Sequence, residues 1–470
     1  MKSINYLSGL LAGLLTLGSV VNTYANTEAK RPDKPDRAQP VKQRPSISLP
    51  EKANGKKALG LLKKSGKLPE FARFYGMSEA QVTAIFQNDP SAYIDQKGAL
   101  FYVEPAKEEA TSPVGEEATL PINSGANELN IPLSETFLLE SKPGSSKTLF
   151  LDFDGHVIQN TEWNVSYEVA TIVNPPFDID GNPGSFNTTE LTRIQRIWKR
   201  VAEDFAAFDI NVTTRDFGND AIVRSSSSDT VFGSHVVITT NVIDSTKTFC
   251  SSCGGIAYVG AFDNVGARYK PAYVYFNKLG SNEKYIAEAI SHEAGHNMGL
   301  KHDGLLATST TGAQVYYSGH GSGETAWAPI MGTGYGKSLV QWSKGEYLNA
   351  NQQEDDYLVM QNNSLYFDVD DYGDTPSNAE PLKAQTGSGF ADFTLQGTLQ
   401  GPNDVDLFKL TLGAGPLSIQ AKPFHLSPNV DVLVTLLNDQ GNALASANPA
   451  EQLAATLSTD IPNNGNYFIR

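Results

Sequence analysis

The feature that most constrains this chain is the stretch SHEAGHNMGLKHDG, which begins at Ser291. Residues four apart lie on one face of a helix, so His292 and His296 can direct two imidazoles at the same metal ion. Glu293 follows the first histidine, where its carboxylate can reach a water bound to that ion. Gly299 can take a left-handed backbone conformation that ends the helix and turns the chain sharply. The spacing therefore predicts a metal site on a helix that ends in a tight turn.

His302 comes three residues after that glycine and supplies a third ligand. Three nitrogen ligands and one water form the open tetrahedral arrangement of catalytic zinc, whereas structural zinc sites are closed by four protein ligands. The pattern H-E-x-x-H alone also occurs by chance on surface helices. Here three of the seven histidines in the chain fall inside one short stretch. This clustering favours a metal site over a fortuitous helix.

With its third histidine, the stretch resembles the zinc-binding signature of the metzincin metalloendopeptidases. Asp303, directly after that histidine, makes it more similar to the adamalysin (reprolysin) and matrixin branches than to the serralysins, which usually carry proline there. Metzincins also have a methionine turn beneath the metal, and Met331 in the sequence APIMG matches it. The resemblance implies one catalytic zinc, Glu293 as the general base, and structural support from Gly299, Asp303 and Met331.

Two further side chains follow the motif. Tyr335 comes four residues after Met331, whereas astacins and serralysins place a zinc-switching tyrosine two residues after the methionine. The sequence therefore leaves the role of Tyr335 open. His320 lies in a loop rich in glycine, serine and threonine, and we interpret it as a solvated loop residue in preference to a fourth ligand.

The fold class that the resemblance implies is α+β, with a metzincin-type catalytic domain at residues 147–365. Apolar residues at helical spacing predict a helix over residues 188–205. A polar helix over residues 343–358 is expected to end the domain. Apolar and β-branched runs predict strands at residues 148–153, 210–213, 236–239, 256–262 and 272–276.

For such a domain the resemblance implies a mixed twisted sheet with the active-site helix and the methionine turn. It also implies that the strand before the last forms the sheet edge to which a substrate adds as an extra strand. By order along the chain, the candidate residues of this edge are Gly255, Ile256, Ala257 and Tyr258.

The N-terminal part of the chain predicts export and a small folded segment. Residues 1–25 are typical of a secretory signal peptide, because a lysine precedes an apolar run and small residues near Ala25 offer a cleavage site. We interpret residues 26–146 as an α+β propeptide with polar linkers, whose folded core spans about 56–103. In that core Ser78 and Gln81 form a capping box that opens a helix.

We expect this N-terminal segment to inhibit the protease by occupying its cleft sterically. Matrixin propeptides, and many adamalysin propeptides, block zinc with a cysteine, but this chain has no cysteine before Cys250. The alternative is an independent N-terminal module.

Cys250 and Cys253 form a C-x-x-C pair and are the only cysteines of the chain. In an exported protein this pair favours a local disulfide. Half of a structural zinc site and a redox pair are the alternatives, and no second ligand pair supports the zinc interpretation.

Calcium is a further possible cofactor. Asp152 and Asp154 end a predicted strand, where a turn is the simpler role. Residues 178–182 read DIDGN and resemble a calcium loop, but Glu190 comes one position too late for the spacing of an EF-hand.

Residues 366–470 predict a β-sandwich domain, because short strands alternate with turn residues. The sequences NDVDLF at 403–408 and NGNYF at 464–468 resemble the bacterial pre-peptidase C-terminal domain of secreted proteases. Arg470 falls within a predicted strand, so we expect the sequence to be a truncated product.

Together these features predict a secreted, zinc-dependent endopeptidase that cleaves extracellular proteins and is made as an inactive preproprotein. Its expected partners are protein or peptide substrates and its own propeptide. The net charge of −16 argues against nucleic acid, since phosphate binding needs a basic surface. No stretch beyond the signal peptide has the apolar length of a membrane span. The alternative is a secreted adhesin or matrix-binding protein with a vestigial protease domain, against which the intact histidines and Glu293 argue.

Overall fold

The computed structural model describes residues 41–107, 131–244, 246–309, 312–382, 385–386 and 391–470. The predicted signal peptide at residues 1–25, and most of the polar linker before the catalytic domain, lie outside the described residues. Within the described ranges, no helix has the length and apolar character needed to cross a membrane.

One eight-stranded sheet runs through the N-terminal and catalytic parts, in the order β1-β2-β3-β9-β10-β8-β4-β7. Strands β7, β4, β8 and β10 are parallel to one another, and β9 is antiparallel to both of its neighbours. Its strands are β1 (Ala53–Asn54), β2 (Ala92–Ile94), β3 (Leu100–Pro105), β4 (Lys147–Asp152), β7 (Asn211–Thr213), β8 (Phe232–Thr239), β9 (Cys253–Tyr258) and β10 (Ala272–Tyr275). The five strands predicted for the catalytic part are thus confirmed, with small shifts of their ends.

Two long helices, α5 (Thr188–Asp204) and α6 (Glu283–Asn297), cover one face of this sheet. Ile194 and Trp198 of α5 and Ile290 of α6 share a core with Leu149 and Val274 of the sheet. The helix predicted for residues 188–205 is therefore confirmed. It begins at a capping box, in which the Asn187 side chain accepts a hydrogen bond from the Glu190 backbone N–H at 3.0 Å.

The opposite face of the sheet packs against aromatic side chains. Alternate residues of a strand point to opposite faces, so Tyr273 and Tyr275 of β10 lie on this face and join Trp163 and Phe249 in a second core. Trp163 belongs to α4 (Glu162–Tyr167), which lies between β5 (His156–Gln159) and β6 (Thr171–Asn174) in the chain.

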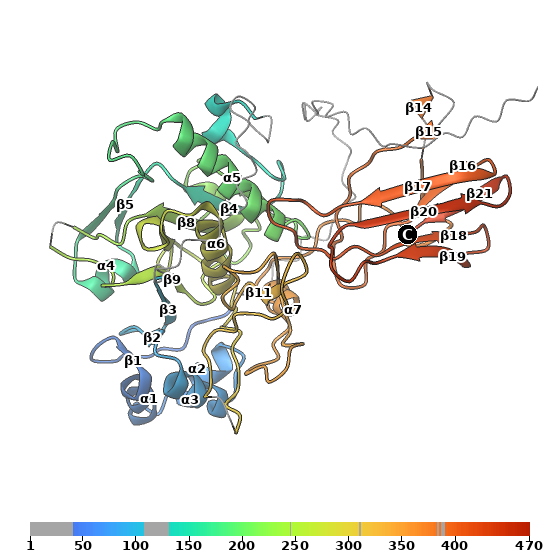
Figure 1. The fold of residues 1–470 in the computed structure, drawn as a ribbon. Coiled ribbons are helices and arrows are strands. Elements are labelled where there is room, and N and C mark those ends of the chain that lie inside the picture. The colour runs from blue at the N-terminus through green and yellow to red at the C-terminus, as the bar shows by residue number, and fades with distance from the viewer. Residues whose placement is uncertain (1–40, 108–130, 245, 310–311, 383–384, 387–390) are drawn as a thin grey trace, which may run out of the picture.

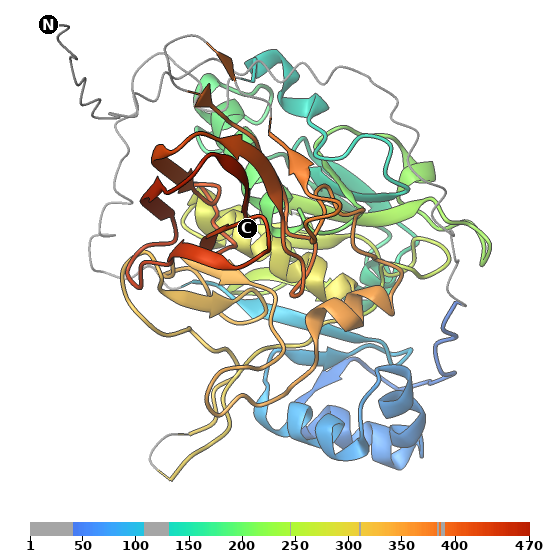
Figure 2. The ribbon, with the colours of Figure 1, turned by 90° about the vertical axis from the view of Figure 1, so that its right-hand side faces the viewer.

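The N-terminal segment folds into three short helices, α1 (Gly55–Lys64), α2 (Leu68–Phe74) and α3 (Glu79–Asn88), packed on β1–β3. Figures 1 and 2 both show it below the catalytic part and away from the C-terminal strands. The predicted capping box of Ser78 and Gln81 is present at the start of α3. Ordered chain begins earlier than the predicted folded core at 56–103, because Ile47 and Leu49 are buried in the same core.

The helix predicted for residues 343–358 is wrong over most of its length. The structure has only α7 (Asp356–Gln361), which begins where the Asp355 side chain accepts a hydrogen bond from the Leu358 backbone N–H at 3.1 Å. Before it, Gly345 has a positive φ of 71°, which no α-helix contains. The polar residues of this stretch form a loop rather than a helix face.

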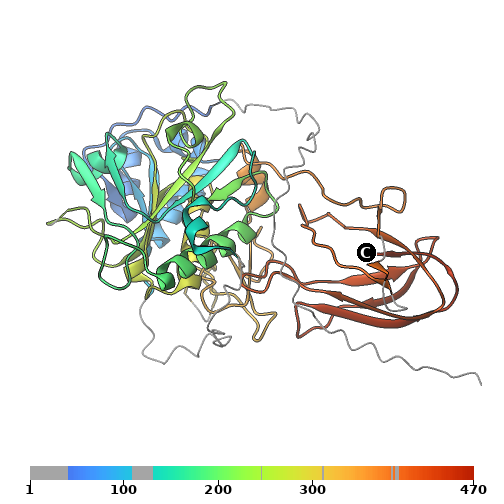
Figure 3. The same ribbon diagram turned by 90° about the horizontal axis from the view of Figure 1, so that it is seen from above.

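The C-terminal part, residues 366–470, stands beside the catalytic part (Figure 3), and its described residues form two larger pieces of sheet and the short pair β14-β15; all strand pairs are antiparallel except β13 with β16. One has the order β13-β16-β21-β18-β19 and the other is the pair β17-β20, and their apolar residues share one core. The predicted sandwich and its assignment to a domain family both stay predictions. Its strands are β13 (Glu380–Pro381), β14 (Gln385–Thr386), β15 (Ala391–Asp392), β16 (Phe408–Leu412), β17 (Gly415–Ala421), β18 (Val434–Leu437), β19 (Ala443–Ala447), β20 (Ala455–Ile461) and β21 (Gly465–Ile469).

Candidate metal centre

Helix α6 carries His292, Glu293 and His296 into the interior, where all three side chains are buried. The helix begins at Asn282, whose side chain accepts a hydrogen bond from the Lys284 backbone N–H at 3.0 Å. The helical spacing of four residues thus brings the first two imidazoles to one place, with ring centroids 4.7 Å apart.

Gly299 provides the turn that the sequence predicts. Its φ is +105°, and its N–H donates to the His296 carbonyl at 2.9 Å just after the helix ends. A Cβ at this position would lie 2.6 Å from Nδ2 of Asn363, so no other residue fits without displacing its neighbours. The turn returns His302 to the site, with its Nε2 3.2 Å from Nε2 of His296.

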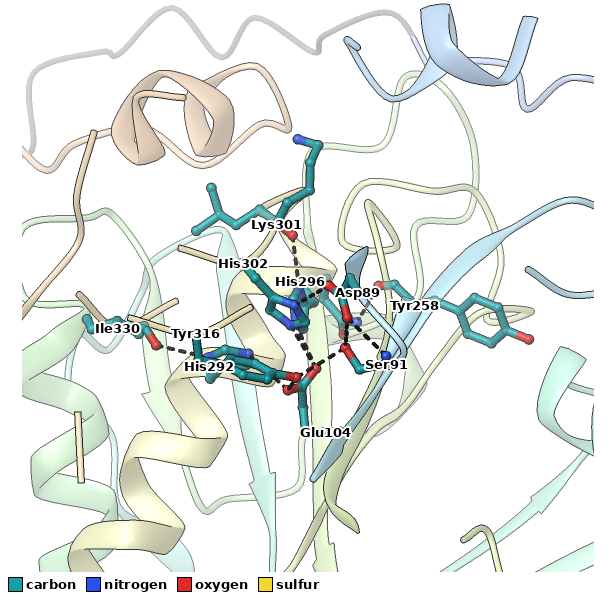
Figure 4. A network of polar contacts seen from close by, with 12 residues as sticks. Asp89, Ser91, Glu104, Tyr258, His292, His296, Lys301, His302, Tyr316 and Ile330 are labelled. Atoms are coloured by element: carbon teal, nitrogen blue, oxygen red, sulfur yellow. Dashed lines mark hydrogen bonds and ion pairs between the residues drawn. The ribbon is translucent and has the colours of Figure 1, made fainter. Parts of the chain in front are cut away.

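The outer nitrogens of the three imidazoles are held by acceptors (Figure 4). His292 Nδ1 lies 2.9 Å from the Ile330 carbonyl, and His296 Nδ1 lies 2.9 Å from the Leu300 carbonyl. His302 Nδ1 lies 2.8 Å from a carboxylate oxygen of Asp89. Such contacts fix the proton on Nδ1 and leave the Nε2 lone pair for a metal. The structure therefore directs three Nε2 atoms toward one point.

Glu104 of β3 supplies a fourth group to this cluster. Its Oε1 lies 2.9 Å from Nε2 of His302 and 3.4 Å from Nε2 of His296, and its Oε2 lies 3.7 Å from Nε2 of His292. Tyr316 donates its hydroxyl hydrogen to Oε2 at 2.5 Å. The three histidines and Glu104 thus place ligand atoms within 4.8 Å of one another.

This set of donors fits zinc. Three imidazole nitrogens and one carboxylate oxygen are ordinary zinc ligands in a four-coordinate site. His292 Nε2 is buried and has no hydrogen-bond partner among the described residues. A buried polar atom without a partner is costly, and a metal at the cluster would satisfy it.

The electrostatics of the cluster also favour a cation. Burial lowers the pKa of His292 to about 3, and burial likewise lowers the pKa of His296, so both rings are neutral and can act as ligands. Burial by itself lowers the pKa of His302, but the carboxylates of Glu104 and Asp89 raise it to about 10. Two buried carboxylates around three imidazoles therefore call for a positive charge, which either a proton or a metal ion can supply.

Glu293 lies beside the cluster and is not one of its ligand groups. Burial, and then the charge of Glu104, raise the pKa of Glu293 well above its ordinary value. Its Oε2 has no hydrogen-bond partner within the described part of the chain. A Cβ at Gly255 of β9 would lie 2.7 Å from Cδ of Glu293, so the glycine leaves the room that this carboxyl group occupies.

Met331 and Asp303 pack and hydrogen-bond next to the histidine motif. Gly295 of α6 faces Met331, and a Cβ there would lie 2.6 Å from its sulfur. The Asp303 backbone N–H donates to the Met331 carbonyl at 2.9 Å, and the Asp303 carboxylate accepts from Ser343 Oγ at 3.0 Å and Gln352 Nε2 at 2.8 Å. Both residues thus connect the turn that carries His302 to later segments of the chain, at Met331, Ser343 and Gln352.

The two residues with open roles lie outside the cluster. His320 is exposed and its Nδ1 lies 2.9 Å from the Tyr317 hydroxyl, which suits the predicted loop position. Tyr335 packs on Tyr285 with ring centroids 4.9 Å apart. It borders a cavity of about 280 Å³ beside His292 and Glu293.

The predicted disulfide between Cys250 and Cys253 is present, with Cα atoms 5.9 Å apart, directly at the start of β9. It shapes the loop that leads into the candidate substrate edge. The alternatives of a zinc half-site and a free redox pair are not needed to account for these cysteines.

The acidic segments considered for calcium already have internal partners. An Asp152 carboxylate oxygen lies 2.9 Å from His235 Nε2 and 3.1 Å from His156 Nδ1. Asp178 accepts backbone N–H groups of its own loop, and Glu190 accepts from the Ile179 and Asn187 backbones as part of the helix cap. Calcium at these places stays a prediction.

The sequence did not single out Glu104, Asp89 or Tyr316. Glu104 directly follows the predicted folded core at about 56–103, and the polar sequence after it reads as a linker. Asp89 precedes a proline and reads as a helix end. The pairing of β3 with β9, two strands far apart in the chain, brings these carboxylates to the histidines.

Comparison with known protein families gives a match that includes the histidine motif. Residues 199–303 match the model of the reprolysin-like metallo-peptidase family M12B. The match contains the C-terminal end of α5, the substrate-edge candidates and the whole histidine motif, and it ends at Asp303. It supports a metzincin-type zinc metallopeptidase, which is what the motif predicted. The comparisons with curated proteins and with solved structures found no match to the chain.

Proposed function

We propose that this chain is a secreted zinc-dependent endopeptidase made as an inactive precursor. The observation that carries the proposal is the convergence of three buried imidazoles with the carboxyl group of Glu293 beside them. His292, His296 and His302 would hold the metal. The family match over residues 199–303 supports the same chemistry.

In the proposed reaction the chain supplies the base and the place for the peptide. When bound, zinc supplies Lewis-acid polarisation of the scissile carbonyl and a more acidic water. Glu293 takes the proton of the attacking water and passes it to the leaving amine, because its Oε2 is the free buried acceptor next to the imidazoles.

Substrate would bind along β9, at the predicted residues Gly255, Ile256, Ala257 and Tyr258. On one side this strand pairs with β10 of the catalytic part, and on the other side it pairs with β3 of the N-terminal segment. When β3 leaves, the backbone N–H and C=O groups on that side become available to a peptide. Strand addition of this kind gives affinity through main-chain hydrogen bonds.

The test of the proposed function is metal content and peptide cleavage by the chain after its N-terminal segment has been removed. We expect about one zinc per chain, from the three-histidine ligand set, and hydrolysis of unstructured peptides. Zinc without cleavage of any peptide in a diverse library would favour the adhesin alternative. N-terminal sequencing of the exported protein tests the signal peptide and the site of precursor cleavage.

A further inference from the structure

We propose that Glu104 is a removable fourth ligand of the metal, by which the N-terminal segment keeps the enzyme latent. The inference rests on the proposed function, and it adds a defined chemical contact to the steric blocking that the sequence predicts. Three independent contacts of the segment carry it: its strand pairing, its carboxylates and its aromatic packing.

The first contact is the strand pairing of β3 with β9. The two strands are antiparallel, with Phe101 opposite Tyr258 and Glu104 opposite Gly255. These are the backbone positions at which a substrate would add. Since one side of a strand can pair with one partner only, the segment and a substrate exclude each other.

The second contact is the carboxylate at the three imidazoles. Glu104 is 8% exposed and its oxygens lie between 2.9 and 3.7 Å from the Nε2 atoms of all three histidines. A catalytic zinc keeps one position open for water or substrate. Glu104 stands at that position, and a side-chain carboxylate there cannot be hydrolysed as a peptide carbonyl can. The segment thus lies in the substrate's place without being a substrate.

The third contact is the packing around this carboxylate. The ring of Tyr102 stacks on His296, with centroids 4.5 Å apart, and covers His302 at 4.1 Å. Asp89 of the same segment holds His302 Nδ1 at 2.8 Å. Tyr316, from the catalytic part, donates to Glu104 Oε2. The segment therefore supplies the fourth ligand, an orienting group for one histidine and a cover over two.

The segment continues past the metal site in the direction of the cavity. The Lys107 ammonium lies 3.5 Å from the ring centroid of Tyr285 and 5.1 Å from that of Tyr335. The N-terminal segment thus also lines the cavity beside His292 and Glu293. Cleavage of the linker alone leaves all these contacts in place, so activation needs release of β3 as well.

The test uses the full-length, uncleaved chain loaded with cobalt in place of zinc, since the absorption spectrum of cobalt reports its ligands. The wild type, Glu104→Gln and Glu104→Ala are compared with Glu79→Gln, an exposed glutamate of the same segment. A small hydroxamate that chelates the metal is then titrated into each protein. Gel filtration and thermal melting establish that each variant is folded.

We expect the spectra of both Glu104 variants to differ from that of the wild type, and the hydroxamate to bind them at least about tenfold more tightly, a change equivalent to 1.4 kcal/mol. Glu79→Gln should behave as the wild type. Identical spectra and equal hydroxamate binding in the wild type and both Glu104 variants would overturn the inference. A wild-type chain that takes up no metal at all would instead count against the proposed function, so the two failures are distinct.

Discussion

The substitution Gly255→Ala tests how closely β9 approaches the proposed general base. A Cβ at Gly255 would lie 2.7 Å from Cδ and 2.9 Å from Cγ of Glu293, where ordinary contacts begin at 3.4 Å. The carboxyl group must therefore move by roughly 1 Å, and a displacement of that size at a reacting group can cost about 10²-fold in rate. Because no histidine is touched, the metal should remain bound.

The assay is steady-state cleavage of a fluorogenic peptide by the activated enzyme, with zinc measured in the same samples. Gly254→Ala is the matched control, since its Cβ would meet only a flexible Leu279 methyl group at 3.0 Å once β3 is gone. Displacement of Glu293 lowers kcat, whereas displacement of the whole strand raises KM. If Gly255→Ala kept the kcat of Gly254→Ala with zinc bound, the assignment of Glu293 as a base held against β9 would be wrong.

Four further substitutions have separate expected outcomes. Glu293→Gln should lose about 10²–10⁴-fold in turnover and keep its zinc, which metal analysis beside the kinetics would check. His296→Ala should lose zinc and activity together, and elemental analysis showing full zinc in this variant would contradict the ligand assignment. Asp89→Asn should weaken zinc binding by the uncleaved chain by about 10–100-fold, the usual effect of removing a partner of a metal-bound histidine; competition with a chelator measures it. Burial raises the pKa of Asp204 to about 8. The preference of the folded state for the protonated carboxyl group therefore contributes fully to the free energy of unfolding below the unfolded pKa near 3.9. This contribution is lost as the pH rises through about 8. Asp204→Asn should therefore melt at a higher temperature than the wild type above pH 8. Equal melting temperatures there would refute the claim that the buried, ionised carboxylate of Asp204 destabilises the fold.

The sequence predicts the parts of the site that depend on local spacing. His292, His296 and His302 meet because a helix and one glycine turn place them, and both can be recognised from neighbouring residues alone. The helix at residues 188–205 and the strands of the catalytic sheet follow from apolar periodicity for the same reason. The capping box at Ser78 also requires only local sequence.

The sequence does not predict the parts that depend on distant pairing or on a single backbone angle. Glu104 reaches the histidines because β3 pairs with β9, a strand about 150 residues later in the chain. The residues near Glu104 do not predict which residues of β9 lie opposite it. The helix expected over residues 343–358 fails because Gly345 adopts a positive φ. In the C-terminal part, the strand Ala443–Ala447 has the sequence ALASA, whose residues have low β propensity, so only its neighbours in the sheet define it.

The sharing of one sheet by the N-terminal segment and the catalytic part also bears on solubility. While β3 is in place, both sides of β9 are paired. Its release exposes a row of unpaired backbone groups on the strand CGGIAY, which carries no charge to deter other chains. Uncharged open strands of this kind are templates for association between molecules. If activation releases β3 as proposed, the enzyme would aggregate more readily in concentrated solution than the uncleaved chain, and light scattering before and after cleavage would measure the change.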